Sequence, residues 1–303
     1  MRDVGTLLEA LPYIKEFHGK TVVIKYGGAA MERDDLKDEF ARDVVLLKYV
    51  GMNPIVVHGG GPEITRYMEM LGLEVKFDDR GRRISDPETV ELAKMVLIGK
   101  INNEIVGNLN RHAEAFKRQE EGSETRGPSA LGLCGDDGAL FEVHRSIQDE
   151  GKPSLGLVGT IKSPDDVNVV VLNDVAEDFI PVVASVGADR EGVSYNVNAD
   201  EVAGAIATAL GAYKLIFLTD VVGLLEDPED SKTHVAQCSS EEIGAKLDAD
   251  EVGGGMVPKL EACRLALGAG VTAAHIIDGR EPHSLLIELF TDSGVGTKIF
   301  PGG

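Results

Sequence analysis

The chain has 303 residues, 43% of them hydrophobic, which is enough apolar material for one large domain or two lobes. Acidic residues outnumber basic ones by 51 to 30, and the net charge of −21 argues against binding to nucleic acid or anionic membranes, which would repel such a protein. No stretch approaches the roughly 20 apolar residues that span a bilayer, and the N-terminus lacks a signal peptide's basic start and cleavage site. We therefore expect a cytoplasmic protein, whose acidic surface suits either a salt-rich cytoplasm or an ordinary one.

The N-terminal segment 6–17 has the periodicity of an amphipathic helix. A helix here places five apolar side chains on one face, namely Leu7, Leu8, Leu11, Ile14 and Phe17. That face must pack against something, either the chain's own body or a partner subunit.

Farther along, β-branched runs alternate with segments of helical periodicity, which predicts successive βα units, an α/β fold and a mostly parallel sheet. Strands are expected at 21–26, 54–58, 131–134, 155–162, 180–186, 214–219 and 272–278. Helices are expected at 34–50, 62–71, 86–112, 199–210, 240–247, 256–267 and 282–290.

Local signals refine two places in this pattern. Ser85 and Glu88 have the spacing of a capping box, with Pro87 in the first turn, so the helix at 86–112 has a well-marked start. The segment 117–128, KRQEEGSETRGP, is polar and charged, and we expect a disordered or mobile surface excursion there.

Cysteine and histidine carry no motif. Cys134, Cys238 and Cys263 are widely spaced and form no C-x-x-C pair, so we expect simple buried or half-buried thiols. The seven histidines lack the spacing of metal ligands, and we predict no structural metal site.

Three glycine clusters lie where a strand meets a turn or a helix. They are KYGG at 25–28, HGGGP at 58–62 and GGGMVPK at 253–259. Loops rich in glycine let backbone N–H groups crowd around an anion, and a following helix N-terminus adds a favourable dipole. Two of the clusters also carry a lysine, which predicts a site for several phosphate groups.

Standard nucleotide-binding motifs do not explain this site. Gly19-Lys20-Thr21 imitates the end of a P-loop, but Ile14 stands where that motif needs its first glycine. The glycine-rich segment 268–273 follows a predicted helix and enters a strand, the reverse of a dinucleotide fingerprint. The catalytic loop and DFG motif of protein kinases are also missing.

The ordered set of motifs resembles the amino acid kinase family over about residues 5–300, and within it the branch that phosphorylates N-acetyl-L-glutamate. The matching segments are IKYGGAAM at 24–31, VVHGGGPEI at 56–64, GRRISD at 81–86, LIGKINNEIV at 97–106, YNVNADEVAGAIA at 195–207, LTDVVGLL at 218–225 and GGGMVPKLEA at 253–262. The resemblance implies an open, mostly parallel sheet sandwiched by helices in two lobes, as in carbamate kinase. It divides the chain into an N-terminal helical extension (1–19), an acetylglutamate-binding lobe (20–211) and an ATP-binding lobe (212–303).

Members of this branch use ATP with Mg²⁺ to phosphorylate the side-chain carboxylate of N-acetyl-L-glutamate, the second step of arginine biosynthesis. By this resemblance Lys25 and Lys259 stabilise the moving phosphoryl group, and Asp200 orients both lysines. Phosphoryl transfer needs mainly positioning and charge neutralisation, which suits these residues. The alternatives are solvated lysines and an Asp200 that serves only as a helix N-cap. The ion is expected to bind mainly through phosphates and water, because no dense carboxylate cluster is visible.

The resemblance also assigns substrate and nucleotide contacts. The acceptor is expected at Gly60, Gly61, Arg83 and Asn196. A guanidinium suits the acceptor's α-carboxylate, and Arg82 is the competing candidate for that role. Nucleotide contacts are expected at Gly27, Gly28, Thr219, Asp220, Gly254 and Gly255. Thr219 and Asp220 could instead simply end a strand.

The N-terminal segment resembles the extra helix of arginine-inhibited members, which assemble as hexamers built as trimers of dimers. Arginine would then bind near Lys214, His275, Glu288 and Gly294, and a nitrogen-signalling regulator of the PII type is a further possible partner. Two kinds of alternative stay open. One is a related kinase for another carboxylate, such as carrier-linked aminoadipate, glutamate or aspartate, and the other is a non-catalytic arginine sensor.

Overall fold

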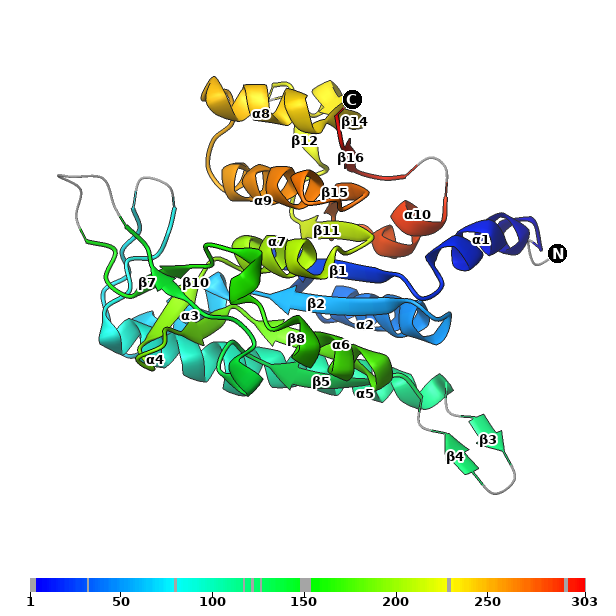
Figure 1. The fold of residues 1–303 in the computed structure, drawn as a ribbon, viewed down its shortest axis with the longest axis horizontal. Coiled ribbons are helices and arrows are strands. Elements are labelled where there is room, and N and C mark those ends of the chain that lie inside the picture. Colours follow the sequence, from blue (N-terminus) through cyan, green and yellow to red (C-terminus); the bar gives the residue numbers. More distant parts are fainter. Residues whose placement is uncertain are drawn as a thin grey trace.

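The computed structural model describes residues 4–31, 33–78, 81–116, 118–120, 123–125, 127–147, 154–227, 230–291 and 294–302. Its centre is an eight-stranded sheet with the order β14-β16-β15-β11-β1-β2-β8-β5 (Figure 1). Every pairing in this sheet is parallel except that of β15 with β16. The predicted α/β class and mostly parallel sheet are confirmed.

The strands of the large sheet are β1 (Thr21–Tyr26), β2 (Asn53–His58), β5 (Ser129–Leu133), β8 (Phe179–Ala184), β11 (Lys214–Thr219), β14 (Gln237–Ser239), β15 (Ala273–Asp278) and β16 (Thr297–Phe300). A smaller sheet contains β6 (His144–Arg145), β7 (Val158–Thr160), β9 (Val186–Ala188) and β10 (Ser194–Val197). Two short hairpins pair β3 (Arg118–Glu120) with β4 (Ser123–Thr125), and β12 (Leu224–Leu225) with β13 (His234–Val235).

The α-helices are α1 (Val4–Phe17), α2 (Asp34–Tyr49), α3 (Gly61–Met70), α4 (Pro87–Lys94), α5 (Asn103–Ala113), α6 (Val169–Asp178), α7 (Ala199–Leu210), α8 (Ser240–Asp248), α9 (Met256–Gly268) and α10 (Ser284–Phe290). A π-helical segment, Met95–Asn102, joins α4 to α5. Helices cover both faces of the large sheet (Figure 1). No helix in the described part of the chain is both long and apolar enough to cross a membrane.

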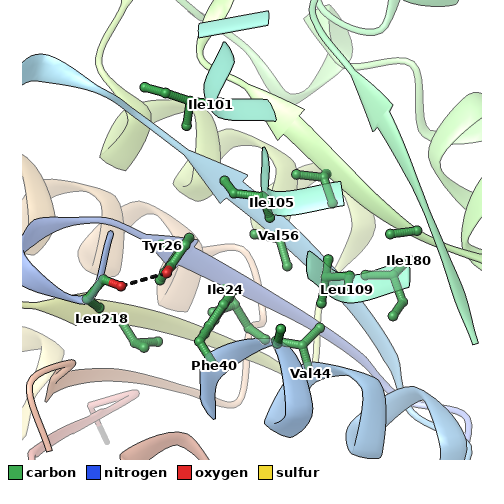
Figure 2. Close-up of a cluster of buried hydrophobic side chains, with 14 of the residues drawn as sticks. Ile24, Tyr26, Phe40, Val44, Val56, Ile101, Ile105, Leu109, Ile180 and Leu218 are labelled. Carbon is green, nitrogen blue, oxygen red and sulfur yellow. Dashed lines mark hydrogen bonds between the residues drawn. The ribbon is translucent and has the colours of Figure 1, made fainter. Parts of the chain in front are cut away.

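Apolar side chains that alternate along the strands form two hydrophobic cores, one on each face of the sheet. In β1, Ile24 and Tyr26 join the core that also contains Phe40 of α2, and the rings of Tyr26 and Phe40 stack with their centroids 3.8 Å apart (Figure 2). Val23 points into the other core, which α7 and α9 cover. Successive side chains of a strand point to opposite faces. Lys25 therefore lies on the same face as α7 and α9.

The predicted helix at 86–112 is interrupted. Its middle third, Met95–Asn102, is π-helical, with α4 before it and α5 after it. A π-helix has a wider turn than an α-helix and is rare except near functional sites. The apolar periodicity of the sequence does not reveal such a segment, because the buried stripe continues through it.

The predicted capping box at this helix is wrong. Asp86, not Ser85, is the N-cap, and its side chain accepts a hydrogen bond of 2.8 Å from the backbone N–H of Thr89. Ser85 is fully buried, and its hydroxyl donates to the carbonyl of Arg83. Pro87 occupies the first turn as predicted.

Two predicted strands differ from the observed ones at the point where the chain enters the small sheet. The strand expected at 155–162 shortens to β7 (Val158–Thr160), and the strand expected at 180–186 ends at Ala184, after which β9 starts at Val186. Ser185 lies at the crossing point, and its carbonyl accepts a hydrogen bond from the N–H of Val197. Strands of two to four residues are too short for the alternation of apolar residues to predict them.

The segment 117–128 contains a hairpin where disorder or mobility was expected. Arg118 pairs with Thr125 and Glu120 with Ser123 in antiparallel register. Backbone hydrogen bonds do not depend on apolar content, so a polar segment can form a hairpin. Residues 117, 121, 122 and 126 lie outside the described residues.

The predicted apolar face of helix α1 is partly buried and partly exposed. Ile14 and Phe17 pack against the body of the chain, where the ring centroid of Phe17 lies 5.6 Å from that of Tyr213. Leu8 and Leu11 are instead 59% and 49% exposed. The side chain of Leu7 lies outside the described residues. The helix therefore docks on its own chain through Ile14 and Phe17, and it projects from one end of the molecule (Figure 1).

Candidate active site

Two lysines from different elements converge on one aspartate. Lys25 of β1 lies 3.1 Å from Asp200 of α7, measured from Nζ to Oδ1, and Lys259 of α9 lies 2.9 Å from Oδ2 of the same carboxylate. Lys259 also donates to the carbonyl oxygen of Gly255. The structure thus brings together the three residues that the motifs predicted to be catalytic, although they are up to 234 positions apart in the sequence.

Asp200 is not the cap of α7. That role belongs to Asn198, whose side-chain oxygen accepts a hydrogen bond of 2.8 Å from the N–H of Asp200. The carboxyl group of Asp200 is therefore available to both lysines. Burial raises its pKa, but the charges of Lys25 and Lys259 outweigh burial, so the pKa lies below its usual value. The carboxylate consequently remains charged at neutral pH between its two cations.

A cavity of about 650 Å³ opens beside Lys25. It is lined by the predicted residues Lys25, Gly27, Gly28, Gly60, Gly61, Arg83 and Asn196. The remaining predicted residues, namely Asp200, Thr219, Asp220, Gly254, Gly255 and Lys259, do not line it. Lys25 therefore lines the cavity and also pairs with Asp200, which in turn pairs with Lys259 of α9 outside the cavity.

The cavity carries positive charge within a strongly acidic protein. Six basic side chains line it, namely Lys25, Lys37, Arg66, Arg82, Arg83 and Lys100. Three carboxylates line it as well, namely Glu63, Glu104 and Glu201. Because a low-dielectric cleft focuses the field of its charged walls, this basic excess favours small anions even though the net charge of the chain is −21.

The structure distinguishes the two neighbouring arginines. Arg82 is bound by Asp78, which accepts from its Nε at 2.9 Å and from its Nη2 at 2.8 Å. Arg83 is 6% exposed and donates to uncharged partners, the carbonyl of Gly61 and the hydroxyl of Thr65. Within the described residues it has no carboxylate partner, and burial lowers its pKa. A buried guanidinium without a counter-ion is the better candidate for binding a carboxylate.

The HGGGP loop presents free backbone donors to the cavity. Gly60 precedes α3, and its carbonyl accepts the helix's first hydrogen bond, from Ile64. Neither the N–H of Gly60 nor that of Gly61 hydrogen-bonds to another residue that the structure describes. Gly60 also has no room for a side chain, because an added Cβ would lie 2.9 Å from Leu97 and overlap Ile101. The N-terminus of α3 thus offers N–H groups and a favourable dipole to an anion.

Another group of predicted residues gathers at the carboxyl ends of β1 and β11. Gly28 has a φ of +67°, and a Cβ there would lie 3.2 Å from the backbone nitrogen of Asp220. Thr219 ends β11, is 3% exposed, and accepts a hydrogen bond at its hydroxyl from the N–H of Val221. Gly254 and Gly255 lie elsewhere, ahead of α9 and next to Lys259.

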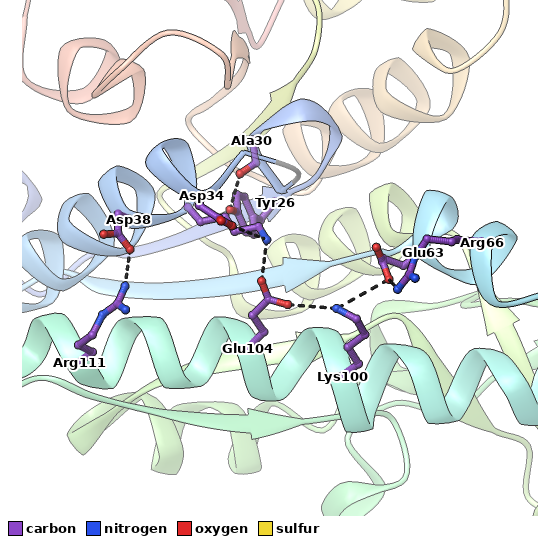
Figure 3. Close-up of polar contacts among 10 residues, drawn as sticks. Tyr26, Ala30, Asp34, Asp38, Glu63, Arg66, Lys100, Glu104 and Arg111 are labelled. Atoms are coloured by element: carbon purple, nitrogen blue, oxygen red, sulfur yellow. Dashed lines mark hydrogen bonds and ion pairs between the residues drawn. The ribbon is translucent and has the colours of Figure 1, made fainter. Parts of the chain in front are cut away.

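A chain of ion pairs along the cavity was not anticipated from the sequence. Glu104 lies 2.6 Å from Lys37 and 3.4 Å from Lys100, and Glu63 lies 3.7 Å from Lys100 and 2.8 Å from Arg66. Figure 3 shows Lys100 and Glu104 on one helix facing Glu63 and Arg66 on α3. The hydrogen bond from Lys37 contributes most to a lowered pKa of Glu104. The helical spacings of Lys100 with Glu104 and of Glu63 with Arg66 were the available signal.

The four residues predicted for an arginine site lie together next to α1. Nδ1 of His275 is 2.5 Å from the carboxylate of Glu288, and both side chains are buried. Gly294 has a φ of +56°, and a Cβ there would lie 2.8 Å from Glu288. Nζ of Lys214 lies 4.9 Å from the ring centre of Phe17. Burial raises the pKa of Glu288, but His275 together with the backbone N–H groups of Val295 and Gly296 outweighs burial, so the pKa is lowered and the carboxylate is charged.

Cysteines and metal ligands play no visible part in this site. Cys134, Cys238 and Cys263 are free and buried, and burial raises the pKa of each thiol. The described residues contain no cluster of three or more histidine, cysteine, aspartate or glutamate side chains with the geometry of a metal site.

Comparison with known proteins gives the family. The model of the amino acid kinase family matches residues 20–278. The chain belongs to the amino acid kinase family, as its ordered motifs predicted.

Relatives across the full length narrow this assignment. Acetylglutamate kinase from Moorella thermoacetica is 46% identical over 310 aligned residues, which cover 100% of this chain and 98% of that protein. The predicted resemblance to the acetylglutamate kinase branch is thereby confirmed.

Solved structures confirm the fold. N-acetylglutamate synthase from Neisseria gonorrhoeae, complexed with coenzyme A and N-acetyl-glutamate, superposes with a TM-score of 0.82 at 22% identity, covering 99% of this chain and 64% of that one. Carbamate kinase from Giardia lamblia, bound to AMP-PNP, superposes with a TM-score of 0.63 at 16% identity, covering 94% and 99%. The predicted carbamate kinase-like architecture is correct.

Proposed function

We propose that the chain transfers the γ-phosphoryl group of ATP to the side-chain carboxylate of N-acetyl-L-glutamate, giving N-acetyl-L-glutamyl 5-phosphate and ADP in arginine biosynthesis. The observation that carries this proposal is the carboxylate of Asp200 held between Lys25 and Lys259 at the edge of a basic cavity. The full-length similarity to acetylglutamate kinases supports the choice of acceptor.

The proposed reaction is a direct in-line transfer. An oxygen of the acceptor carboxylate bonds to the γ-phosphorus while the bond from that phosphorus to the β–γ bridging oxygen breaks, and ADP leaves with the electron pair. Lys25, on the cavity side, neutralises the moving phosphoryl group, and Lys259, on the α9 side, neutralises the leaving oxygen. Asp200 holds both ammonium groups in place.

The acceptor occupies the cavity in this proposal. Arg83 binds the α-carboxylate, the N–H groups of Gly60 and Gly61 hold the reacting carboxylate, and Asn196 binds the middle of the molecule. The cavity's carboxylates all have partners, including Glu201, which accepts from the hydroxyl of Thr160 and the N–H of Ile161. No free carboxylate is therefore left among the lining residues for an ammonium group, which favours an acetylated acceptor over free glutamate or aspartate.

ATP occupies the other side of Lys25, over the lobe at 212–303, while the acceptor belongs to the lobe at 20–211. Gly27, Gly28, Gly254 and Gly255 offer backbone N–H groups to its phosphates, and Thr219 and Asp220 lie toward the nucleoside. Mg²⁺ enters with ATP and is held by phosphate oxygens and water, which agrees with the lack of a carboxylate cluster in the described residues. When bound, the ion neutralises phosphate charge.

The test is an acyl phosphate assay with a panel of acceptors. Hydroxylamine traps the product formed from Mg·ATP with N-acetyl-L-glutamate, glutamate, aspartate or aminoadipate in parallel. Hydroxamate formed only from N-acetyl-L-glutamate supports the proposal. Product with another acceptor would show that the chain is a related kinase with a different substrate. No product with any of the four acceptors would favour a non-catalytic arginine sensor.

We also propose that L-arginine inhibits the enzyme and that the chain assembles through α1, as a hexamer built as a trimer of dimers. The charged Glu288 beside Lys214, His275 and Gly294 supports a guanidinium site next to this helix, and the exposed Leu8 and Leu11 support a partner there. N-acetylglutamate synthase from Neisseria gonorrhoeae, of the same fold, has been solved with L-arginine. A PII-type regulator is a further proposed partner.

Arginine inhibition is tested by a dose–response curve on the wild-type protein and on Glu288→Gln. A curve that bends in the wild type and shifts to higher arginine concentration in the variant supports the site. A flat wild-type curve rejects the regulation without affecting the proposed reaction.

A further inference from the structure

His58 connects the HGGGP loop to the interior of the protein. It is the last residue of β2, and its side chain is fully buried. Nδ1 lies 3.0 Å from the carbonyl oxygen of Gly59, and Nε2 lies 3.0 Å from Nδ2 of Asn102. A carbonyl oxygen only accepts, so Nδ1 must donate, and an amide nitrogen only donates, so Nε2 must accept. The ring is therefore neutral and in one tautomer.

Asn102 fixes the imidazole from the π-helical segment. It is 4% exposed, and Nδ2 donates its second hydrogen to the carbonyl of Val182 in β8 at 2.8 Å. A Cβ at position 132 would overlap the amide oxygen of Asn102, so Gly132 of β5 makes room for this side chain. The π-helical segment, the sheet and the loop are thus joined through a single imidazole ring.

The orientation of the Gly59–Gly60 peptide follows from these contacts. In a trans, planar peptide unit the C=O and N–H groups point in opposite directions. The carbonyl of Gly59 points toward the buried imidazole, so the N–H of Gly60 points the other way, and Gly60 lines the cavity. That N–H has no partner among the residues that the structure describes.

We infer, resting on the proposed phosphoryl transfer, that His58 is a positioning residue for the acceptor: with Asn102 it locks the Gly59–Gly60 peptide so that the Gly60 N–H donates to the acceptor's reacting carboxylate. Burial lowers the pKa of His58 to about 4, so the ring stays neutral in the pH range of a cytoplasmic enzyme. The HGGGP motif then needs its histidine for a reason separate from that of its glycines.

His58→Phe is the main variant, because it keeps a ring of similar volume but cannot donate to Gly59. The acceptor KM is expected to rise by about tenfold, the order of magnitude for a misplaced hydrogen bond to a charged group, while kcat and the KM for Mg·ATP change by less than about threefold. His58→Asn places an amide N–H near the position of Nδ1, so the acceptor KM is expected to return most of the way to the wild-type value.

Ile55→Val is the matched control, because Ile55 lies on the same strand, is buried in the other core and points to the opposite face of the sheet from His58. It is expected to lower the melting temperature without changing either KM. If His58→Phe does not fold, Asn102→Ala is the second variant. It keeps the imidazole of His58 but removes the amide that bonds to Nε2, so it is expected to raise the acceptor KM by a smaller factor.

Two outcomes overturn the role of His58. One is an unchanged acceptor KM in His58→Phe, and the other is an equal rise in both KM values with no rescue by His58→Asn. A second readout does not depend on activity: the ¹⁵N–¹H signal of Gly60 in the free protein is expected to shift in His58→Phe and not in Ile55→Val. A wild-type protein without kinase activity on N-acetyl-L-glutamate rejects the proposed function instead, and the Gly60 signal then still decides whether His58 orients the peptide.

Discussion

At the scale of single residues, the proposed site depends on how charge is shared between neighbouring side chains. Asp200 forms ion pairs with two lysines, so neither lysine is neutralised completely and both keep positive charge for phosphate groups. Arg83 has no carboxylate partner in the described chain, whereas Arg82, the adjacent residue, has one. Residues of the same type are therefore expected to differ in function because their partners differ.

Lys25→Ala and Lys259→Ala are expected to reduce turnover by roughly 100-fold or more while the protein stays folded, because each removes a donor to charge that develops in the transition state. Turnover and thermal melting are measured for both variants. Lys246→Ala is the control. Lys246 lies on α8, and its ion pair with Glu251 is a long surface contact, 3.8 Å from Nζ to the carboxylate. Full turnover in both lysine variants would refute the site assignment.

Arg83→Ala is expected to act through acceptor binding. Hydrogen bonds to charged groups contribute about 1.5–3 kcal/mol, so the acceptor KM should rise by about 10- to 100-fold with little change in the KM for Mg·ATP. Arg82→Ala is the neighbouring control and should leave the acceptor KM within about threefold, because its guanidinium is already bound by Asp78. Equal effects of the two variants would show that Arg83 has no special role.

At the scale of elements, the site is assembled by contacts between pieces that are distant in the chain. The carboxyl ends of β1 and β2, the N-termini of α3 and α7 and the start of α9 meet around Lys25. In a parallel sheet the strands' carboxyl ends share one edge, which is where ligands bind in open α/β folds.

The contact between α2 and α10 makes stability depend on pH. Asp43 of α2 is 3% exposed and lies 2.7 Å from Nδ1 of His283, and burial raises its pKa to about 6 although His283 opposes the change. A carboxyl whose pKa is raised by folding stabilises the fold below its unfolded pKa of about 4, and this contribution is lost as pH rises through about 6.

Asp43→Asn cannot ionise, so its free energy of unfolding should rise relative to wild type by up to about 3 kcal/mol between about pH 4 and pH 7. Urea denaturation at several pH values measures the difference. Asp34→Asn is the control, because it removes a carboxyl group from the same helix at a side chain that is 99% exposed. A constant difference for Asp43→Asn would contradict the raised pKa.

The exposed apolar side chains of helix α1 are the proposed surface through which copies of the chain assemble. Leu8→Asp combined with Leu11→Asp should lower the molar mass in solution, because it places charge on the exposed half of the helix while the packed half, with Phe17, remains docked. Light scattering measures the mass, and Val170→Asp, at an exposed apolar position on α6, is the control. An unchanged mass in the α1 variant would exclude α1 as the assembly surface.

How far the sequence predicts the structure also depends on the element. The strands at 21–26 and 214–219 match β1 and β11, because β-rich runs with three or four consecutive apolar residues next to glycine turns leave little ambiguity. The π-helical segment and the small sheet could not be predicted, since neither changes the apolar periodicity. The lysine–aspartate contacts were predicted from ordered motifs, whereas the ion pairs around Glu104 and the link from His58 to Asn102 depend on tertiary packing.

At the scale of the whole molecule, the chain separates an acidic surface from a basic cavity. Its net charge of −21 keeps polyanions away, while the lysines and arginines around the cavity attract small anions. The large sheet runs without a break from β14 to β5, so the proposed acceptor side and the proposed nucleotide side share one scaffold. Lys25 belongs to this sheet, and Lys259 belongs to α9, which packs against one of its faces.

The most direct test of the central claim is a ³¹P NMR spectrum of the wild-type protein with Mg·ATP and N-acetyl-L-glutamate. We expect the γ-phosphate signal of ATP to fall as the signals of ADP and an acyl phosphate appear in equal amounts. ADP accompanied only by inorganic phosphate from the first time point, or unchanged ATP, would contradict phosphoryl transfer to this acceptor.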